Sequence, residues 1–169
     1  MTATSPRPAS SQLVFVPLRS TDASDVVHAG ELEGPVPAVM VTPELCETFD
    51  VVPDTEEAEL AALQVAAVWS LIRGDRRLVG VFSVEEPVSP YPQEQGNGAV
   101  QLATVRRAQM QAFFSGEDAG SEAALAARLS DLDIDEAWAL PEVSQLAGQI
   151  PLQWHDASEL SAYLSAMEN

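Results

Sequence analysis

The chain has 169 residues, with 26 acidic and eight basic side chains and a formal net charge of −18. All the basic residues are arginines, so the chain offers no lysine for a Schiff base, a phosphate-binding loop or a lysine general base. The negative charge opposes nucleic-acid binding, which draws its affinity from Lys and Arg side chains that neutralise phosphates, and it favours a protein partner with a basic surface.

The single cysteine, Cys46, cannot form an intramolecular disulfide, which indicates a reducing compartment, so we expect the protein in the cytoplasm. Residues 1–11 are rich in Ser, Thr and Pro and lack the apolar stretch of a secretory signal, so the sequence predicts a disordered tail there. The most apolar stretch, residues 60–72, contains Gln64 and Ser70 and is too short to cross a bilayer. We therefore expect no membrane insertion.

Short apolar runs are typical of strands that lie inside a sheet. Such runs cover residues 13–18, 36–41, 78–84, 99–105, 109–115 and, near the end of the chain, 151–155. The runs at 99–105 and 109–115 are separated by Arg106 and Arg107, a spacing that predicts a hairpin or a bent strand.

Capping residues mark the helices. Thr42 followed by Pro43 is typical of a helix start, because the hydroxyl accepts a backbone hydrogen bond and proline fits the first helical position. Asp54 with Glu57 three residues later predicts the start of a long, mostly buried helix, and Gly74 is expected to stop it in a left-handed conformation. The predicted helices cover residues 20–29, 42–49, 54–73, 121–129 and 156–167.

Residues 85–98 contain three prolines and two glycines and predict a long loop, either functional or disordered. Strands and helices alternate in the first half of the chain, an order that favours a partly parallel sheet. The sequence therefore predicts a single α/β domain over residues 12–167, with helices packed on a mixed, partly parallel sheet.

Cys46 lies near the N-terminus of its predicted helix, a place where a thiol can act as a nucleophile. Nucleophilic catalysis would need a histidine base, and His28 and His155 are distant in the sequence and lie in no family-type signature. The three residues also match none of the usual zinc patterns. A small buried side chain is the favoured interpretation of Cys46.

Acidic residues occupy positions one, three, five and twelve of a stretch similar to a calcium-binding loop: Asp131, Asp133, Asp135 and Glu142. Position six, a glycine in that motif, is Glu136, and Pro141 is expected to break any helix that follows. An acidic surface on a strand or at a helix start is the favoured interpretation.

Five arginines form two groups: Arg73, Arg76 and Arg77 in the first, and Arg106 and Arg107 in the second. If the groups converge in space, they can bind an anionic ligand by bidentate contacts. Ion pairs within the protein, and capping of a helix end by Arg73, are the alternative.

The three tryptophans, Trp69, Trp138 and Trp154, are scattered, and each is expected to be buried or half-buried. The adjacent acids at 56–57 and 85–86 point in different directions, so they predict surface rather than the carboxylate pair of a glycosidase. The chain contains no G-x-S-x-G motif and no glycine-rich nucleotide loop. The sequence thus names no catalytic, cofactor-binding or metal-ligating residue.

Four segments carry a resemblance: residues 14–18, residues 41–45, the acidic start and alanine-rich body of the helix at 54–71, and residues 152–160. Together they resemble a family of small uncharacterised actinobacterial proteins. The resemblance covers most of the chain after residue 12 and implies a shared fold and a cytoplasmic location, but it supplies no catalytic residues. The chain departs from the family pattern in its N-terminal extension and in its longer 85–98 loop.

Two interpretations of the function remain. The first is a non-enzymatic acidic regulatory or protein-interaction protein, which predicts no deep polar pocket; in one form of it the acidic surface imitates nucleic acid. The second is an enzyme of unrecognised type, whose site is assembled from distant segments and whose cleft holds acids with His28 or His155. We favour the first and expect no cofactor; the oligomeric state stays open.

Overall fold

The computed structural model describes residues 11–149 and 151–168, so all but the last residue of the predicted tail lies outside the described residues. Within these ranges, one sheet contains β1 (Gln12–Pro17), β2 (Glu31–Val39), β3 (Leu78–Val84), β4 (Ser89–Pro90), β5 (Ala99–Arg106), β6 (Met110–Ser115) and β7 (Gln153–Asp156). The α-helices are α1 (Ser20–Ala29), α2 (Pro43–Phe49), α3 (Glu56–Arg73), α4 (Ala119–Ala126), α5 (Ile134–Trp138), α6 (Pro141–Gln149) and α7 (Leu160–Glu168). Short 3-10 helices are η1 (Pro92–Asn97), η2 (Arg107–Gln109) and η3 (Ala157–Glu159).

The sheet has the strand order β4-β5-β2-β1-β3-β6-β7, and every pair of neighbouring strands is antiparallel. Helices do pack on a sheet, as predicted, but the prediction of a partly parallel sheet is wrong. After β1 the chain passes through α1 and returns along β1 in the opposite direction, so that Phe15 lies opposite Val39. Alternating strands and helices indicate parallel pairing only where the helix carries the chain back to the starting end of the first strand.

The connection between β5 and β6 shows that the sheet is curled. The two strands are joined only by η2, yet β2, β1 and β3 lie between them in the sheet. In a flat sheet, four strand spacings would separate β5 from β6 by about 19 Å. The chain from Arg106 to Met110 spans at most about 14 Å, even when extended. The sheet must therefore curve until the end of β5 and the start of β6 approach each other. Of the two arrangements predicted for these strands, a hairpin or a bent strand, the hairpin does not form.

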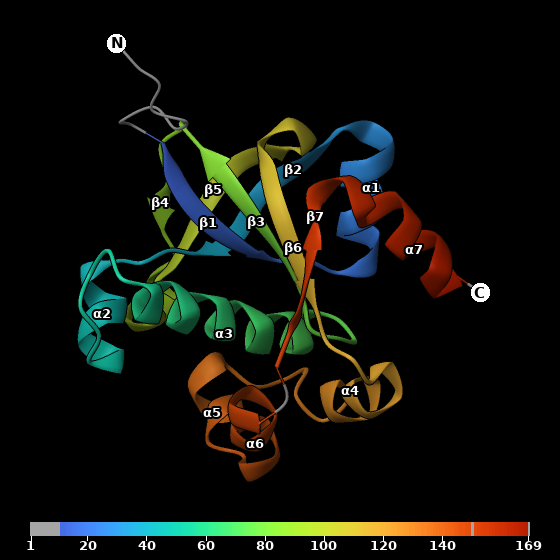
Figure 1. Ribbon diagram of the computed structural model, residues 1–169. Coiled ribbons are helices and arrows are strands. Elements are labelled where there is room, and N and C mark those ends of the chain that lie inside the picture. The colour runs from blue at the N-terminus through green and yellow to red at the C-terminus, as the bar shows by residue number, and fades with distance from the viewer. Residues whose placement is uncertain (1–10, 150, 169) are drawn as a thin grey trace.

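The inner face of the curled sheet is covered by α1 and α7, which pack side by side (Figure 1). Apolar side chains from both ends of the strand order meet there, among them Val105 of β5 and Phe113 of β6. Helix α1 contributes Val26 and α7 contributes Leu160, and all four of these side chains are buried. One hydrophobic core thus fills the space between the curved sheet and two helices.

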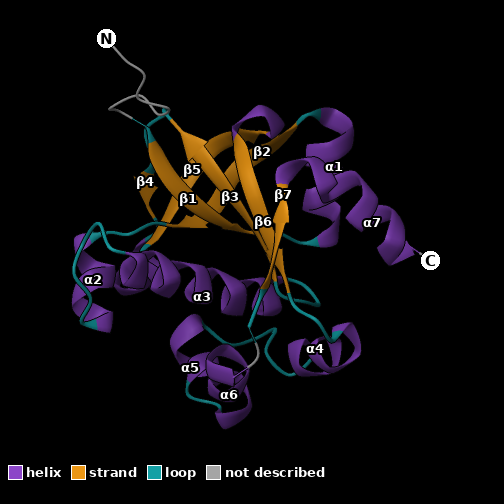
Figure 2. Ribbon diagram, viewed as in Figure 1, coloured by secondary structure: helices purple, strands orange, loops and turns teal. Residues whose placement is uncertain are grey.

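The long helix α3 lies across the other face of the sheet (Figures 1 and 2). It packs there on Phe15, Val79 and Val81. Its opposite side is covered by α4, α5 and α6, where Val68 and Leu71 of α3 belong to a further apolar cluster. Because both sides are covered, α3 is buried around most of its circumference, as the width of its apolar stripe predicts.

Local capping follows the sequence in part. Thr42 caps α2 as predicted, and its Oγ1 accepts a hydrogen bond of 3.1 Å from the backbone N–H of Leu45. The cap of α3 is Thr55 rather than Asp54, which instead adopts a positive φ of 61°. Gly74 ends α3 with φ −137°, so the predicted left-handed stop is wrong. The chain then bends at residues 74–76 before it enters β3.

The segment at 85–98, predicted as a long loop, contains β4 and η1. Its Glu94 and Asn97 are buried polar residues. The Asn97 amide donates hydrogen bonds of 3.1 Å to the carboxylates of both Glu94 and Asp135, and the other Glu94 oxygen accepts one of 2.9 Å from the N–H of Ile134. Polar side chains therefore fasten this segment to the start of α5.

None of the helices within residues 11–149 and 151–168 is long and apolar enough to cross a membrane.

Candidate functional site

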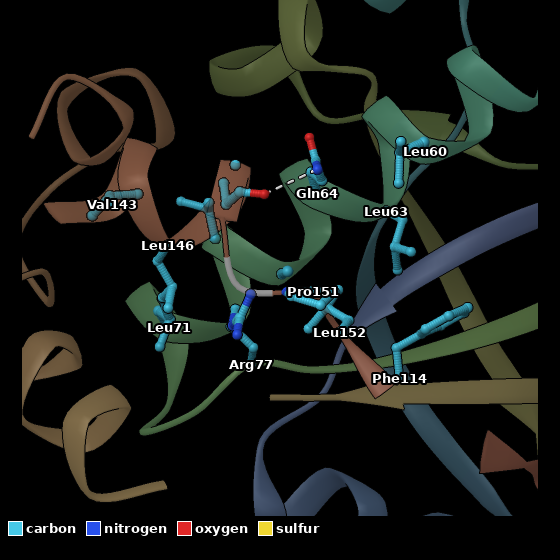
Figure 3. Close-up of a pocket in the computed structure, with 14 residues that line it drawn as sticks. Leu60, Leu63, Gln64, Leu71, Arg77, Phe114, Val143, Leu146, Pro151 and Leu152 are labelled. Atoms are coloured by element: carbon cyan, nitrogen blue, oxygen red, sulfur yellow. Dashed lines mark hydrogen bonds between the residues drawn. The ribbon is translucent and has the colours of Figure 1, made fainter. Parts of the chain in front are cut away.

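An apolar cavity of about 320 Å³ lies between α3, α6 and the segment that leads into β7 (Figure 3). Leu63 of α3, Leu146 of α6, Phe114 of β6 and Leu152 form much of its wall. A volume of this size is at the lower end of the range for small-ligand pockets, about 300–1,000 Å³. The cavity has room for one large apolar side chain or a small molecule.

The two helices beside the cavity are held at a fixed spacing. The side-chain amide of Gln64 in α3 donates a hydrogen bond of 3.1 Å to the carbonyl of Ala147 in α6 (Figure 3). Further along, Val68 and Leu71 of α3 pack in one cluster with Val143 of α6. Packing and a hydrogen bond together therefore shape the cavity before any ligand arrives.

A buried ion pair neutralises the charge that borders the cavity. Arg77, which lines it, has its Nε 2.7 Å from Oε2 of Glu122, and its backbone N–H donates to Oε1 at 3.0 Å. Both side chains are almost fully buried. Gly116 makes room for the carboxylate, because a Cβ at that position would lie 1.9 Å from Oε2. The lining thus presents a mainly apolar surface.

Two large apolar side chains are exposed beside the cavity. Leu60, which lines it, is 52% exposed, and Trp154 in β7 is 60% exposed. Trp154 stands opposite Phe114 in the pairing of β6 with β7, and directly paired residues share one face of a sheet. Since Phe114 lines the cavity, the Trp154 indole lies on the cavity's side of the sheet edge.

The structure corrects the expectation that all three tryptophans are buried or half-buried. Trp69 is buried and makes an edge-to-face contact with Tyr91, and Trp138 makes one with Phe49. Trp154 is exposed, because β7 is the last strand of the sheet and no helix covers this side chain. The sequence predicted a strand here but held no signal for its place at the edge.

The two arginine groups do not converge. The first group lies at the start of β3, whereas η2 carries Arg107 to the other end of β3, where Phe82 pairs with Met110. Each guanidinium has its own acceptor. Arg73 donates to the carbonyl of Pro17 and Arg107 to the carbonyl of Val27. Arg76 donates to the carboxylate of Asp75, Arg77 to that of Glu122, and Arg106 to that of Glu86. A single anion site built from both groups is therefore not formed.

Cys46 is buried in α2, close to Leu45, which packs on the α3 side of the sheet. His28 belongs to α1, and His155 stacks on Phe113, so both histidines lie on the opposite side. The sheet separates the thiol from both candidate bases. The interpretation of Cys46 as a small buried residue is confirmed.

The acidic residues of the calcium-loop-like stretch have separate partners. Asp133 caps α5 and exchanges reciprocal hydrogen bonds with Glu136, while Glu142 accepts a bond of 2.7 Å from Arg128. Pro141 does not break a helix; it begins α6, where its missing N–H costs nothing. Among the described residues, no group of three or more acidic, histidine or cysteine side chains could hold a metal ion.

A comparison with known protein families gives one result for this chain. Residues 13–164 match the model of a family of unknown function (DUF6912). No curated protein and no solved structure matches the chain. The match extends over nearly the whole sequence, from β1 into α7. The chain therefore belongs to this family of unknown function.

Proposed function

We propose that this is an acidic interaction protein that binds a basic segment of a partner protein and takes up one apolar side chain of that segment in the cavity beside α3. The observation that carries the proposal is the cavity itself, with the exposed Leu60 and Trp154 next to it. Large exposed apolar side chains beside a pocket are typical of protein interfaces, and tryptophan is enriched among the residues that dominate binding energy.

Acidic side chains lie beside Leu60 on the same face of α3. Glu56 and Glu57 precede Leu60 by about one helical turn on α3, so they share its face, and both are exposed. Together with the net charge of −18, these carboxylates favour a partner segment that carries Lys or Arg beside its apolar anchor.

The same features disfavour other occupants. A second copy of the chain would bring another net charge of −18 against this surface, and the two copies would repel each other. A small molecule enclosed in 320 Å³ would leave the exposed parts of Leu60 and Trp154 in water. A basic protein segment covers these groups and fills the cavity as well.

The test uses the full chain and three fluorescent model peptides that alternate Lys with Leu, Glu with Leu, and Lys with Ser. We expect the Lys-Leu peptide to bind with a Kd that rises with salt, because screening weakens charge attraction. The Glu-Leu peptide should not bind, and the Lys-Ser peptide should bind at least tenfold more weakly, since it lacks an apolar anchor.

Two variants locate the binding surface. Replacement Trp154→Ala or Leu60→Ser should weaken binding of the Lys-Leu peptide by about tenfold or more, as expected for a central anchor. The matched control is Val52→Ser, which removes an exposed apolar side chain that does not line the cavity. Equal binding by the control and the two variants, or equal binding of all three peptides, contradicts the proposal.

A further inference from the structure

Ser115 and His155 form a hydrogen-bonded pair on the side of the sheet opposite α3. Ser115 ends β6 and is only 1% exposed, and its Oγ lies 2.7 Å from Nε2 of His155 in β7. In the pairing of these strands, Phe113 faces His155 and Ser115 faces Gln153, so the pair is diagonal across two neighbouring strands. The fold thus joins a hydroxyl and an imidazole that are 40 residues apart in the sequence.

Aromatic rings fix the orientation of the imidazole. The ring of His155 stacks on that of Phe113, with centroids 4.5 Å apart and an interplanar angle of 11°. Tyr163 of α7 contacts both rings: its ring centroid lies 5.4 Å from that of Phe113 and 5.5 Å from that of His155. Because these contacts restrict rotation of the ring, Nε2 stays directed at the serine hydroxyl, and it accepts a hydrogen bond from that hydroxyl in the tautomer that carries the ring proton on Nδ1.

The serine borders a cleft of about 430 Å³ between the ends of β6 and β7 and helix α7. Arg76 and Tyr163 line the same space. The Arg76 guanidinium is paired with Asp75 at 3.2 Å, and this hydrogen bond raises its pKa, so the guanidinium stays charged. The hydroxyl of Ser115, which is hydrogen-bonded to His155, and the cation of Arg76 therefore border one cleft.

We propose that Ser115 and His155 are the nucleophile and the general base of a site that cleaves small, uncharged carboxylic esters. The Ser115 Oγ attacks the acyl carbon while its proton passes to Nε2 of His155. The ester C–O bond then breaks, and the leaving alkoxide takes that proton and departs as the alcohol. Water, deprotonated by the same nitrogen, next attacks the acyl-serine, and the acid leaves as Ser115 regains its proton.

Charge and size set the class of substrate. The Arg76 guanidinium can stabilise the negative charge that develops on the carbonyl oxygen, a contribution of about 10²–10³ in kcat for one such donor. Glu117 also lines the cleft, and the net charge of −18 repels an anionic substrate. Among the described residues, no carboxylate is hydrogen-bonded to Nδ1 of His155. The pair therefore acts as a dyad, and we expect its rate of ester hydrolysis to be lower than that of a Ser-His-Asp triad.

This site lies on the other side of the sheet from the apolar cavity and shares none of its lining residues. Its existence is therefore independent of the proposed binding of a basic partner, and the two proposals are tested by separate measurements.

The experiment follows hydrolysis of p-nitrophenyl acetate by the full chain and covalent labelling by a fluorophosphonate, with the adduct mapped by peptide mass spectrometry. We expect turnover by the wild-type protein and an adduct on Ser115. Ser115→Ala and His155→Gln should each lower the rate at least about 100-fold. Arg76→Gln should lower kcat more than it changes KM, because its interaction is made with the developing charge.

The control is Ser144→Ala, which removes an exposed hydroxyl on α6 and should leave rate and labelling unchanged. Circular dichroism and thermal melting show whether each variant is folded, and Ser115→Ala removes only one oxygen. An adduct absent from Ser115, or a wild-type rate in folded Ser115→Ala or His155→Gln, overturns the proposal.

Discussion

The ion pair of Arg77 with Glu122 offers a direct measurement of what one buried contact contributes. Replacement Glu122→Ala leaves the Arg77 guanidinium buried without its carboxylate, and the loss of one partner of such a pair typically costs about 3–5 kcal/mol. We therefore expect the free energy of unfolding, measured by urea denaturation, to fall by about this amount.

The chain supplies a matched control. Arg128 and Glu142 form a second pair with the same N–O distance of 2.7 Å, but its side chains are 55% and 48% exposed, against 3% and 2% for Arg77 and Glu122. Water screens an exposed pair, so Glu142→Ala should change stability little. Equal losses in the two variants would show that burial does not set the strength of the Arg77 contact.

Individual residues were predictable only where their role is local. The hydroxyl of Thr42 and the burial of Cys46 follow from neighbouring residues and from residue type. Glu122 sits in an alanine-rich helix and gives no sign that it reaches Arg77, 45 positions earlier. The exposure of Trp154 and the contact of Ser115 with His155 depend equally on which strands become neighbours.

At the scale of elements, the attachment of η1 to α5 is open to test. Glu94→Ala removes the acceptor of the Ile134 N–H and one of the two acceptors of the Asn97 amide. A buried donor left without an acceptor costs about 1–3 kcal/mol. We expect a loss of this size in the free energy of unfolding, together with faster amide exchange at the start of α5.

The neighbouring Gln95 is exposed and makes a suitable control. Gln95→Ala should change neither stability nor exchange in α5. If Glu94→Ala leaves the exchange of Ile134 unchanged, the buried hydrogen bonds do not hold this segment to the helix.

Several helices and strands were found from the sequence, since capping and apolar runs are local signals, but α5 and α6 were not predicted and β2 begins five residues before its predicted start. The strand at 78–84 was predicted with its exact bounds, and α3 to within two residues at its start. Pairing was not predictable from the same signals. No residue pattern in these strands indicates that β2 pairs antiparallel with β1, or that three strands separate β5 from β6.

For the whole molecule, the net charge of −18 predicts a stability that depends on salt. Carboxylates crowded on a folded surface repel one another, and ions screen that repulsion. At about 20 mM NaCl the Debye length is about 20 Å, so the surface charges still repel one another. Raising NaCl to about 500 mM should therefore raise Tm by several degrees, since each kcal/mol gained in the free energy of unfolding raises Tm by about 2–4 °C. A scanning fluorimetry series checks this, and a Tm that falls with salt contradicts it.

The curled sheet also constrains when the protein can fold. Its central strand β1 pairs Gln12 with Val84, and β2 pairs Glu31 with Arg106. Contacts between residues so far apart in sequence make folding slow, because the entropy of closing a long loop is lost before the strand contacts form. During synthesis, β1 has no β3 to pair with until the chain has been extended past Val84. Until then the apolar run at 13–17 lacks one of its two strand partners, and in this interval the new chain is exposed to aggregation.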